Sequence, residues 1–328
     1  MSRLIERIVI IALLAGVLAG CAGTFTADSK DSNATPGGTP EQNVQEPNNW
    51  PRTYVDALGR QIVLEKKPEK VALLFFRNFE HLFLLGESPV AATDLNVLQE
   101  WASLAPYKDH EIADLGPITS PNLEKLLEID PDLIIAVVGR FESYGDKLEQ
   151  IAPVVVVGSN ENNWQGALRE YGKIFGKEQQ AEAEIARIEA LIADSRKQLA
   201  AYSDKTFAVI MLGEKQLWAF TTQFVFNKES GLGLNPPSHY VDMSTKGEQI
   251  SLEGLAAMNP DYMFVADIGG SSKNAEKYLK NLERDAVWNS LDAVKNGRVY
   301  VLDSSIAAGG PLGIELGVKT IVEKVLAH

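Results

Sequence analysis

The sequence predicts an α/β fold with two Rossmann-like lobes, joined by one long helix and separated by a cleft. Strand-like apolar runs alternate with helix-like stretches along most of the chain, which is typical of parallel sheets flanked by helices. One long amphipathic stretch, residues 178–204, interrupts this alternation. The pattern of residues 122–135 also recurs at residues 251–264, once on each side of the long stretch. This duplication indicates two lobes of similar plan.

Residues 1–20 are predicted to be a secretory signal. Arg3 and Arg7 precede the apolar run Ile8–Leu18, which is shorter than the roughly 20 residues that cross a bilayer as a helix. The run ends in Leu18-Ala19-Gly20-Cys21, which resembles a bacterial lipobox. The resemblance implies that Cys21 is lipidated and becomes the new N-terminus, so that the protein is anchored to the cell membrane and faces outside the cytoplasm. The alternatives are an ordinary secretory signal with an incidental cysteine and an uncleaved helix.

Residues 21–50 are predicted to be a flexible tether, because they are polar and too poor in aliphatic side chains to form a core. Cys21 is the only cysteine, so the body contains no disulfide. The net charge of −13 argues against nucleic acid or an anionic membrane surface as a partner. We therefore expect membrane contact through the lipid anchor only.

The N-terminal lobe is predicted over residues 51–177. It opens with a hairpin whose turn contains Gly59. The apolar run Val71–Phe76 follows, as expected of a strand buried on both faces. Further strands are expected at 89–93, 133–138 and 153–157, and helices around 78–85, 122–129, 142–151 and 163–176.

Residues 178–204 are predicted to form the linking helix, because no glycine or proline interrupts them. Apolar or small residues recur along one face of this helix at Ala181, Ile185, Ile188, Ile192, Ser195, Leu199 and Tyr202. Such a helix would join two lobes as a stiff connection. A large surface helix of a single domain is the alternative.

The C-terminal lobe is predicted over residues 205–328. Its expected strands are 206–212, 217–220, 262–266 and 299–302, and its expected helices lie near 251–258, 274–282 and 312–327. In the duplicated pattern, Asn122 and Ser251 are each predicted to cap a short helix, which a Pro-Asp turn connects to a buried strand.

These features together resemble the iron-siderophore, haem and cobalamin binding proteins of ABC importers. The resemblance is carried by the duplicated pattern and by Asp56–Arg60, Asp114-Leu115-Gly116, Gly297-Arg298-Val299-Tyr300 and Gly309-Gly310-Pro311. It implies a monomer without a cofactor that binds a ferric siderophore in the cleft between its lobes and delivers it to a membrane permease. Haem or cobalamin is the alternative ligand.

Glu124 and Glu253 occupy the same place in the two copies of the pattern. The resemblance implies that these acids lie at the tips of the two lobes and pair with arginines of the two permease subunits. The alternative is a purely local role, since an acid in the first turn of a helix is favoured by the helix dipole.

The candidate ligand contacts are drawn from both halves. Arg77 and Arg140 each follow a predicted strand, and ligands of open α/β sheets bind at the carboxyl ends of strands. Tyr144 lies one helical turn beyond Arg140. The remaining candidates are Lys215, Trp218, Tyr240 and Lys273 in the second half. Each could instead be a solvated charge or a half-buried aromatic residue.

Signatures of enzymes are absent: the sequence contains no Gly-x-Ser-x-Gly, P-loop or His-Glu-x-x-His motif. A tethered hydrolase and an adhesive lipoprotein remain as functions of other classes. The four histidines, His81, His110, His239 and His328, form no cluster with the spacing of metal ligands, so we expect no directly bound metal.

The charge pattern favours a hydroxamate siderophore. Ferric catecholates and citrates are anionic and would need several arginines. The segment Ser304–Ala308, where related citrate-siderophore receptors carry arginines, has none. Arg77, Arg140, Tyr144 and Trp218 could supply the few donors and the aromatic surface that a ferric hydroxamate needs.

Overall fold

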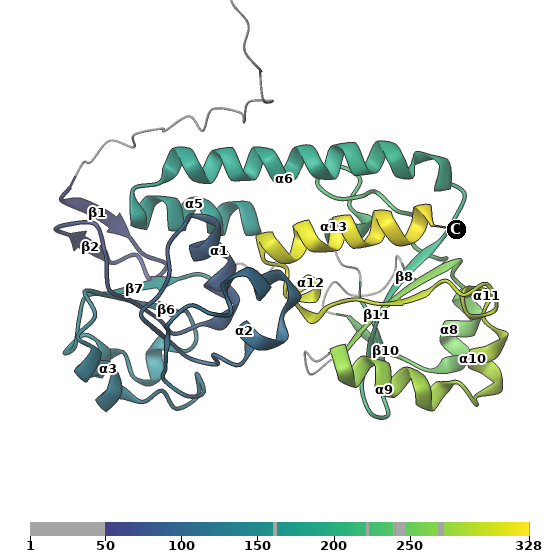
Figure 1. Ribbon diagram of the computed structural model, residues 1–328, viewed down its shortest axis with the longest axis horizontal. Coiled ribbons are helices and arrows are strands. Elements are labelled where there is room, and N and C mark those ends of the chain that lie inside the picture. Colours follow the sequence, from purple (N-terminus) through teal and green to yellow (C-terminus); the bar gives the residue numbers. More distant parts are fainter. Residues whose placement is uncertain are drawn as a thin grey trace, which may run out of the picture. The chain divides into compact units, whose positions relative to one another are not determined.

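The computed structural model describes residues 50–159, 163–220, 223–238, 240, 247–267 and 272–327 (Figure 1). The predicted signal, Cys21 and nearly all of the tether lie outside the described residues, as do His239 and His328. None of the described helices combines the length and the apolar character needed to cross a membrane.

The first lobe contains a hairpin and a parallel five-stranded sheet of order β5-β4-β3-β6-β7. The hairpin strands are β1 (Arg52–Val55) and β2 (Gln61–Leu64), and the sheet strands are β3 (Val71–Leu73), β4 (Ala91–Ala92), β5 (Ala113–Asp114), β6 (Leu133–Val137) and β7 (Val154–Val157). The helices of this lobe are α1 (Phe79–Leu84), α2 (Val97–Glu100), α3 (Leu123–Ile129), α4 (Gly145–Leu148) and α5 (Trp164–Phe175), and short 3-10 helices cover Phe76–Asn78, Ala102–Tyr107 and Phe141–Ser143. Every residue of β3, β6 and β7 is buried, as expected for strands with helices on both faces.

The second lobe contains a mixed sheet of order β10-β9-β8-β11-β12, in which β8, β11 and β12 are parallel and β9 runs antiparallel to both of its neighbours, β8 and β10. Its strands are β8 (Phe207–Leu212), β9 (Leu217–Ala219), β10 (Glu248–Ile250), β11 (Tyr262–Asp267) and β12 (Val299–Val301). Its helices are α7 (Gln223–Phe226), α8 (Leu252–Met258), α9 (Ser272–Leu282), α10 (Ala286–Ser290), α11 (Asp292–Lys295), α12 (Ser304–Ala308) and α13 (Pro311–Leu326). The predicted fold class of two α/β lobes is thus confirmed.

The long helix is α6 (Glu178–Gln198), which a 3-10 turn at Leu199–Tyr202 extends. The predicted stripe is buried from Ala181 to Leu199, and Tyr202 is half-buried. Figure 1 shows α6 running along both lobes, with α5 beneath one half and α13 beneath the other. The helix therefore joins the lobes by continuous apolar packing.

Helix α13 reaches beyond the second lobe, because it packs against α6 and also against α1 of the first lobe. Arg187 on α6 forms an ion pair with Glu315 on α13 at 2.7 Å. A further link joins the backbone N–H of Ala102 in the first lobe to the carboxylate of Asp303, 3.0 Å away in the second lobe. The last helix of the chain therefore completes the packing of the first lobe.

The duplicated pattern has the same structure in both lobes. The Asn122 side chain accepts a hydrogen bond from the Lys125 N–H, and Ser251 accepts one from the Gly254 N–H, each at 3.0 Å. Both helices end in a residue with left-handed backbone, at the equivalent positions 130 and 259. The predicted caps and short helices are confirmed.

The aspartate of each Pro-Asp turn fixes the start of the neighbouring strand. Asp132 accepts a hydrogen bond from the Lys70 N–H at 3.0 Å, just before β3. Its counterpart Asp261 accepts one from the Thr206 N–H at 2.9 Å, just before β8. Each pattern therefore sets the register of the two central strands of its sheet, which aligns the carboxyl ends of those strands at one edge.

Candidate ligand-binding site

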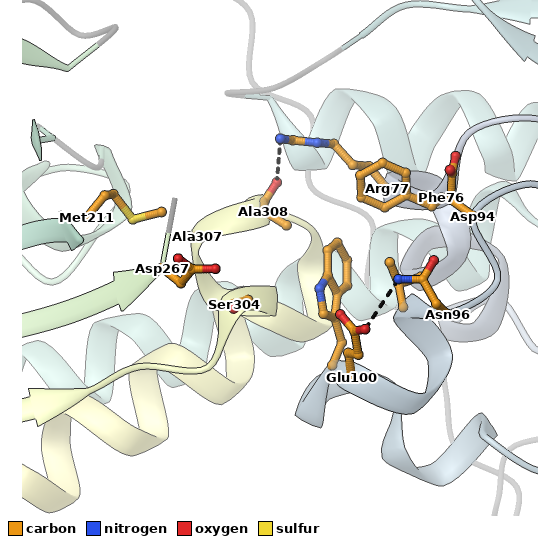
Figure 2. Close-up of a pocket in the computed structure, with 12 residues that line it drawn as sticks. Phe76, Arg77, Asp94, Asn96, Glu100, Met211, Asp267, Ser304, Ala307 and Ala308 are labelled. Carbon is orange, nitrogen blue, oxygen red and sulfur yellow. Dashed lines mark hydrogen bonds between the residues drawn. The ribbon is translucent and has the colours of Figure 1, made fainter. Parts of the chain in front are cut away.

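A pocket of about 320 Å³ lies at the carboxyl ends of strands from both sheets, where ligands of open α/β folds bind (Figure 2). The first lobe contributes the segments that follow β3 and β4, and the second contributes the ends of β8 and β11 and helix α12. The lining residues are Phe76, Arg77, Asp94, Asn96, Val97, Glu100, Trp101, Met211, Asp267, Ser304, Ala307 and Ala308. The volume is at the lower end of the range typical of small-molecule sites.

Arg77 lies where the two lobes meet. Its guanidinium is 5.9 Å from the centre of the Phe76 ring, and its Nη1 is 3.5 Å from the carbonyl oxygen of Ala308 in the second lobe. Figure 2 shows this long contact across the pocket. A guanidinium has five N–H donors, so Arg77 can serve a ligand while it keeps this contact.

The aromatic part of the wall comes from Phe76 and Trp101, whose rings meet edge to face with centroids 5.6 Å apart. Val97, Met211 and Ala307 extend this surface. Ser304 is also at the wall and is 5 % exposed; its hydroxyl has no hydrogen-bond partner within the part of the chain that the structure describes. The pocket thus combines apolar surface with a small number of polar groups.

Three carboxylates line the same pocket. Asp94 follows β4 with left-handed backbone, at φ 51°, and accepts a hydrogen bond from the Ile118 N–H at 3.2 Å. Burial raises the pKa of the Asp94 carboxyl, against the effect of that hydrogen bond. Glu100 on α2 accepts a hydrogen bond from Asn96 at 3.4 Å, and Asp267 is buried at the end of β11.

Arg140 and Tyr144 do not line the pocket but lie beside it. Arg140 is exposed, and its charge opposes the rise in the pKa of Asp94. Tyr144 is half-buried and donates a hydrogen bond to the carbonyl oxygen of Ile118 at 3.2 Å. Tyr144 therefore holds the segment whose Ile118 N–H binds Asp94, Arg140 acts on Asp94 through its charge, and only Arg77 of the three candidates in the first lobe reaches the pocket wall.

The candidates of the second lobe are dispersed. Lys215 is exposed in the turn between β8 and β9, and Lys273 is exposed in the first turn of α9. Trp218 pairs with Met211 across the two strands, so its ring shares a sheet face with a residue of the pocket wall.

Tyr240 belongs to the core and not to the cleft, which corrects the expectation of a ligand contact. Its side chain is fully buried, and its hydroxyl donates to the carbonyl oxygen of Val209 at 2.7 Å while the Val209 N–H donates to the hydroxyl at 3.1 Å. A buried phenol needs such partners, and here the backbone of β8 provides them.

Asp94, Glu100, Trp101, Asp267 and Ser304 were not anticipated from the sequence. Two of them had a usable signal: Asp94 and Asp267 each stand directly after a predicted strand, as Arg77 does. Glu100 and Ser304 lie on helices, and Trp101 directly follows α2; the path of the chain turns these three side chains toward the pocket, and no local pattern reveals that path.

Glu124 and Glu253 are both exposed in the first turns of α3 and α8, and neither lines the pocket. Within the described ranges, no group of three or more His, Cys, Asp or Glu side chains could hold a metal ion. His81 is buried and stacks on Tyr171 with ring centres 5.4 Å apart, and burial lowers the pKa of His81 to about 4.

Comparisons with known proteins agree with this architecture. The family model described as periplasmic binding protein matches residues 71–306. The petrobactin-binding protein YclQ of Bacillus subtilis is 31 % identical over 92 % of each chain, and the iron(3+)-hydroxamate-binding protein YxeB of the same organism is 27 % identical over 99 % of this chain and 98 % of its own.

Solved structures give the same result. The crystal structure of YclQ has a TM-score of 0.68 and 28 % sequence identity, and the alignment covers 84 % of this chain and 96 % of YclQ. The structure of FeuA from Bacillus subtilis with ferri-bacillibactin has a TM-score of 0.68 at 24 % identity, over 84 % of this chain and 99 % of FeuA, which supports the fold. The chain therefore belongs to the periplasmic binding protein family, whose members are binding proteins and not enzymes.

Proposed function

We propose that this protein captures a ferric siderophore outside the cytoplasm and delivers it to the permease of an ABC importer. The observation that carries the proposal is the pocket between the lobes, which offers one guanidinium, aromatic surface and several oxygen acceptors at the carboxyl ends of strands from both sheets. Relatives named for binding petrobactin, iron(3+)-hydroxamate and Fe(3+)-citrate support iron chelates as the ligand class.

The iron is proposed to arrive already wrapped by its chelator, so the protein needs no cofactor and no metal ligands of its own. Within this class we favour a hydroxamate, because Arg77 is the only cationic side chain among the described lining residues. Hydroxamate complexes of iron are neutral or weakly charged and require less compensation than catecholates or citrates.

Native mass spectrometry of the purified protein with ferric hydroxamate, ferric catecholate, ferric citrate, haem and cobalamin tests the proposal. We expect a ferric siderophore to remain bound at one equivalent, and an Arg77→Ala variant to bind it at least tenfold more weakly. Retention of haem or cobalamin alone would contradict the siderophore assignment and favour the alternative ligand.

We further propose that Glu124 and Glu253 dock the monomeric protein onto the two permease subunits, one lobe to each. Their support is the structural equivalence of the two repeats, which presents both acids on exposed first turns outside the pocket. The anchor is proposed to be lipid on Cys21. Metabolic labelling with a fatty acid tests this, since label that persists in the Cys21→Ala variant would exclude lipidation at that residue.

A further inference from the structure

Three segments of the pocket wall meet at one buried side chain, that of Glu80. Arg77 lies three residues before Glu80, in the short helix that leads into α1. Trp101 lies two residues before Ser103, which contacts Glu80, and Ala308 ends α12 just before α13 begins. These segments follow β3, β4 and β12, so they come from both lobes. Glu80 itself is completely buried behind the wall and does not line the pocket.

The two oxygens of the Glu80 carboxylate bind different segments. Oε1 lies 2.5 Å from the Ser103 hydroxyl of the first lobe, and Oε2 accepts a hydrogen bond from the Gly313 N–H of α13 at 2.9 Å. Both of these partners are neutral groups. Since Arg77 is close to Glu80 in the chain, one side chain connects the three wall segments without an ion pair.

Glycine residues allow α13 to approach this carboxylate closely. A Cβ atom at Gly310 would lie 2.1 Å from Oε2 of Glu80, and a Cβ atom at Gly313 would lie 3.3 Å from Oε1. A side chain at position 310 would therefore have to displace the carboxylate. Part of the Gly309-Gly310-Pro311 motif of the sequence is thus explained by the packing around Glu80.

Asp303 forms a second link of the same kind in the opposite direction. Its carboxylate accepts hydrogen bonds from the N–H groups of Ala102 and Ser305, each at 3.0 Å. Ala102 and Ser103 are neighbours, so a carboxylate of each lobe holds the same short segment directly after Trp101. The position of the Trp101 ring in the wall therefore depends on these two links.

We infer that Glu80 is a positioning residue of the binding pocket: its neutral form holds the wall segments of Arg77, Trp101 and Ala308 in the geometry that binds the ligand, and its ionisation loosens them. The effect on the ligand rests on the proposed function. In the neutral form the Glu80 O–H can donate to the Ser103 oxygen, while the other oxygen still accepts from Gly313. A buried charge without a cationic partner is costly, and water that enters to solvate it would separate the segments.

The charged groups around Glu80 are consistent with this role. Burial raises the pKa of Glu80 to about 7, and the charge of Asp303 adds to the rise. Tyr107, in the same short helix as Ser103, remains neutral because burial raises the pKa of its phenol above 10. Glu315 on α13 remains ionised, since its hydrogen bond from Arg187 lowers its pKa to about 2. Neither of these last two groups titrates where Glu80 does.

Three variants distinguish a positioning role from a merely structural one. Glu80→Gln reproduces the neutral form, because its amide N–H can donate to Ser103 and its oxygen can accept from Gly313. Glu80→Ala removes both links. Glu323→Gln, which neutralises an exposed acid near the C-terminal end of α13, is the control for loss of a charge.

The first measurement is the affinity of the mature protein for ferrioxamine B, a ferric trihydroxamate, by intrinsic tryptophan fluorescence from pH 5.5 to 8.5. The bound form needs the ordered wall and should hold the Glu80 proton more tightly than the free form. Wild type and Glu323→Gln should therefore lose affinity roughly tenfold as the pH rises above 7. Glu80→Gln should keep the affinity of the wild type at pH 5.5 throughout, and Glu80→Ala should bind more weakly at every pH.

The second measurement is hydrogen exchange of the ligand-free proteins. After correction for the intrinsic effect of pH on exchange, protection of residues 101–107 and 309–316 should fall several-fold between pH 6 and pH 8 in the wild type. The same segments should remain equally protected in Glu80→Gln. Both proteins contain His81 and His110, so titration of these histidines cancels in the comparison.

The two measurements separate the inference from the proposed function. If the pH profiles of affinity or of protection are the same in the wild type and in Glu80→Gln, the inference is overturned while the siderophore function stands. If the wild type binds no ferric complex at any pH, the proposed function fails. Hydrogen exchange then still decides whether Glu80 holds the wall.

Discussion

The carboxylate of Glu80 on α1 accepts a hydrogen bond from the backbone N–H of Gly313 in the first turn of α13, at 2.9 Å. The hydroxyl of Ser103 donates to the same carboxylate at 2.5 Å, and the side chain is completely buried. A carboxylate at the N-terminus of a helix is favoured by the helix dipole. Burial dominates here, however, and raises the pKa of Glu80 to about 7.

This raised pKa predicts a pH dependence of stability. The folded protein holds the Glu80 proton more tightly than the unfolded chain, whose carboxyl has a pKa of 4.5. The free energy of unfolding contributed by Glu80 is therefore fully present below pH 4.5 and is lost as the pH rises to about 7, by about 3 kcal/mol. Urea unfolding of the wild type and of Glu80→Gln from pH 4.5 to 8 should show this change as a difference between the two proteins. A difference that does not vary with pH would contradict the assignment.

The contribution of His81 to the free energy of unfolding should depend on pH with the opposite sign to that of Glu80. Its ring nitrogens are buried without partners among the described residues, and burial lowers its pKa from 6.5 to about 4. The neutral ring is thus favoured by folding, and stability is lost as the pH falls below 6.5. In His81→Phe this loss should disappear, so the variant should gain up to about 3 kcal/mol relative to the wild type between pH 7 and pH 4. Urea unfolding measures this gain, and an equal acid sensitivity of both proteins would argue against it.

Two glycine substitutions should have opposite effects. A Cβ atom at Gly313 would lie 2.3 Å from the carbonyl oxygen of Ser305, so Gly313→Ala should lower the free energy of unfolding by about 2 kcal/mol. At Gly254 in α8, the nearest atom to a Cβ is the Ser251 hydroxyl oxygen at 3.6 Å. Gly254→Ala should therefore stabilise the protein by about 0.5–1 kcal/mol, because alanine favours the helix. Thermal unfolding of both variants measures the contrast, and similar effects of both would refute it.

If the two repeats dock onto the permease, substitutions in them should reduce siderophore uptake without changing the affinity for the ligand. Glu124→Lys and Glu253→Lys should each reduce siderophore uptake roughly tenfold, since charges at an interface rim set register and association rate. The affinity for ligand should remain unchanged, because neither residue lines the pocket. Glu128→Lys, on the same helix as Glu124, is the control and should transport normally. Loss of ligand affinity with intact uptake would reverse the assignment.

The sequence predicts the fold well because its two main indications, the helix caps of the repeats and the apolar stripe of the long helix, each depend on residues that are close together in the chain. The caps at Asn122 and Ser251 and the apolar stripe of α6 depend on residues within a few positions of one another. The bridging role of α13 depends on contacts with α1, more than two hundred residues away, and has no local signature.

The binding site is less predictable than the fold, because the local sequence around a residue does not show whether its side chain faces the cleft. Arg77 is predictable because it follows a strand, and the same rule also points to Asp94 and Asp267 when it is applied to acids as well as to cations and aromatic residues. Tyr240 shows the opposite difficulty: an aromatic residue whose hydroxyl binds the backbone of β8 has the same local sequence appearance as one that faces a ligand.

The packing of α13 on the first lobe also has a consequence for synthesis and export. Glu80 and Gly313 are separated by 233 positions, so a chain that emerges from its N-terminus can pair the strands of the first lobe long before it can enclose Glu80. A product that ends before Pro311 leaves this carboxylate and the apolar face of α1 exposed to water, and such openings are where proteases cut. We therefore expect a chain that lacks α13 to be cut within its first lobe faster than a chain that contains this helix.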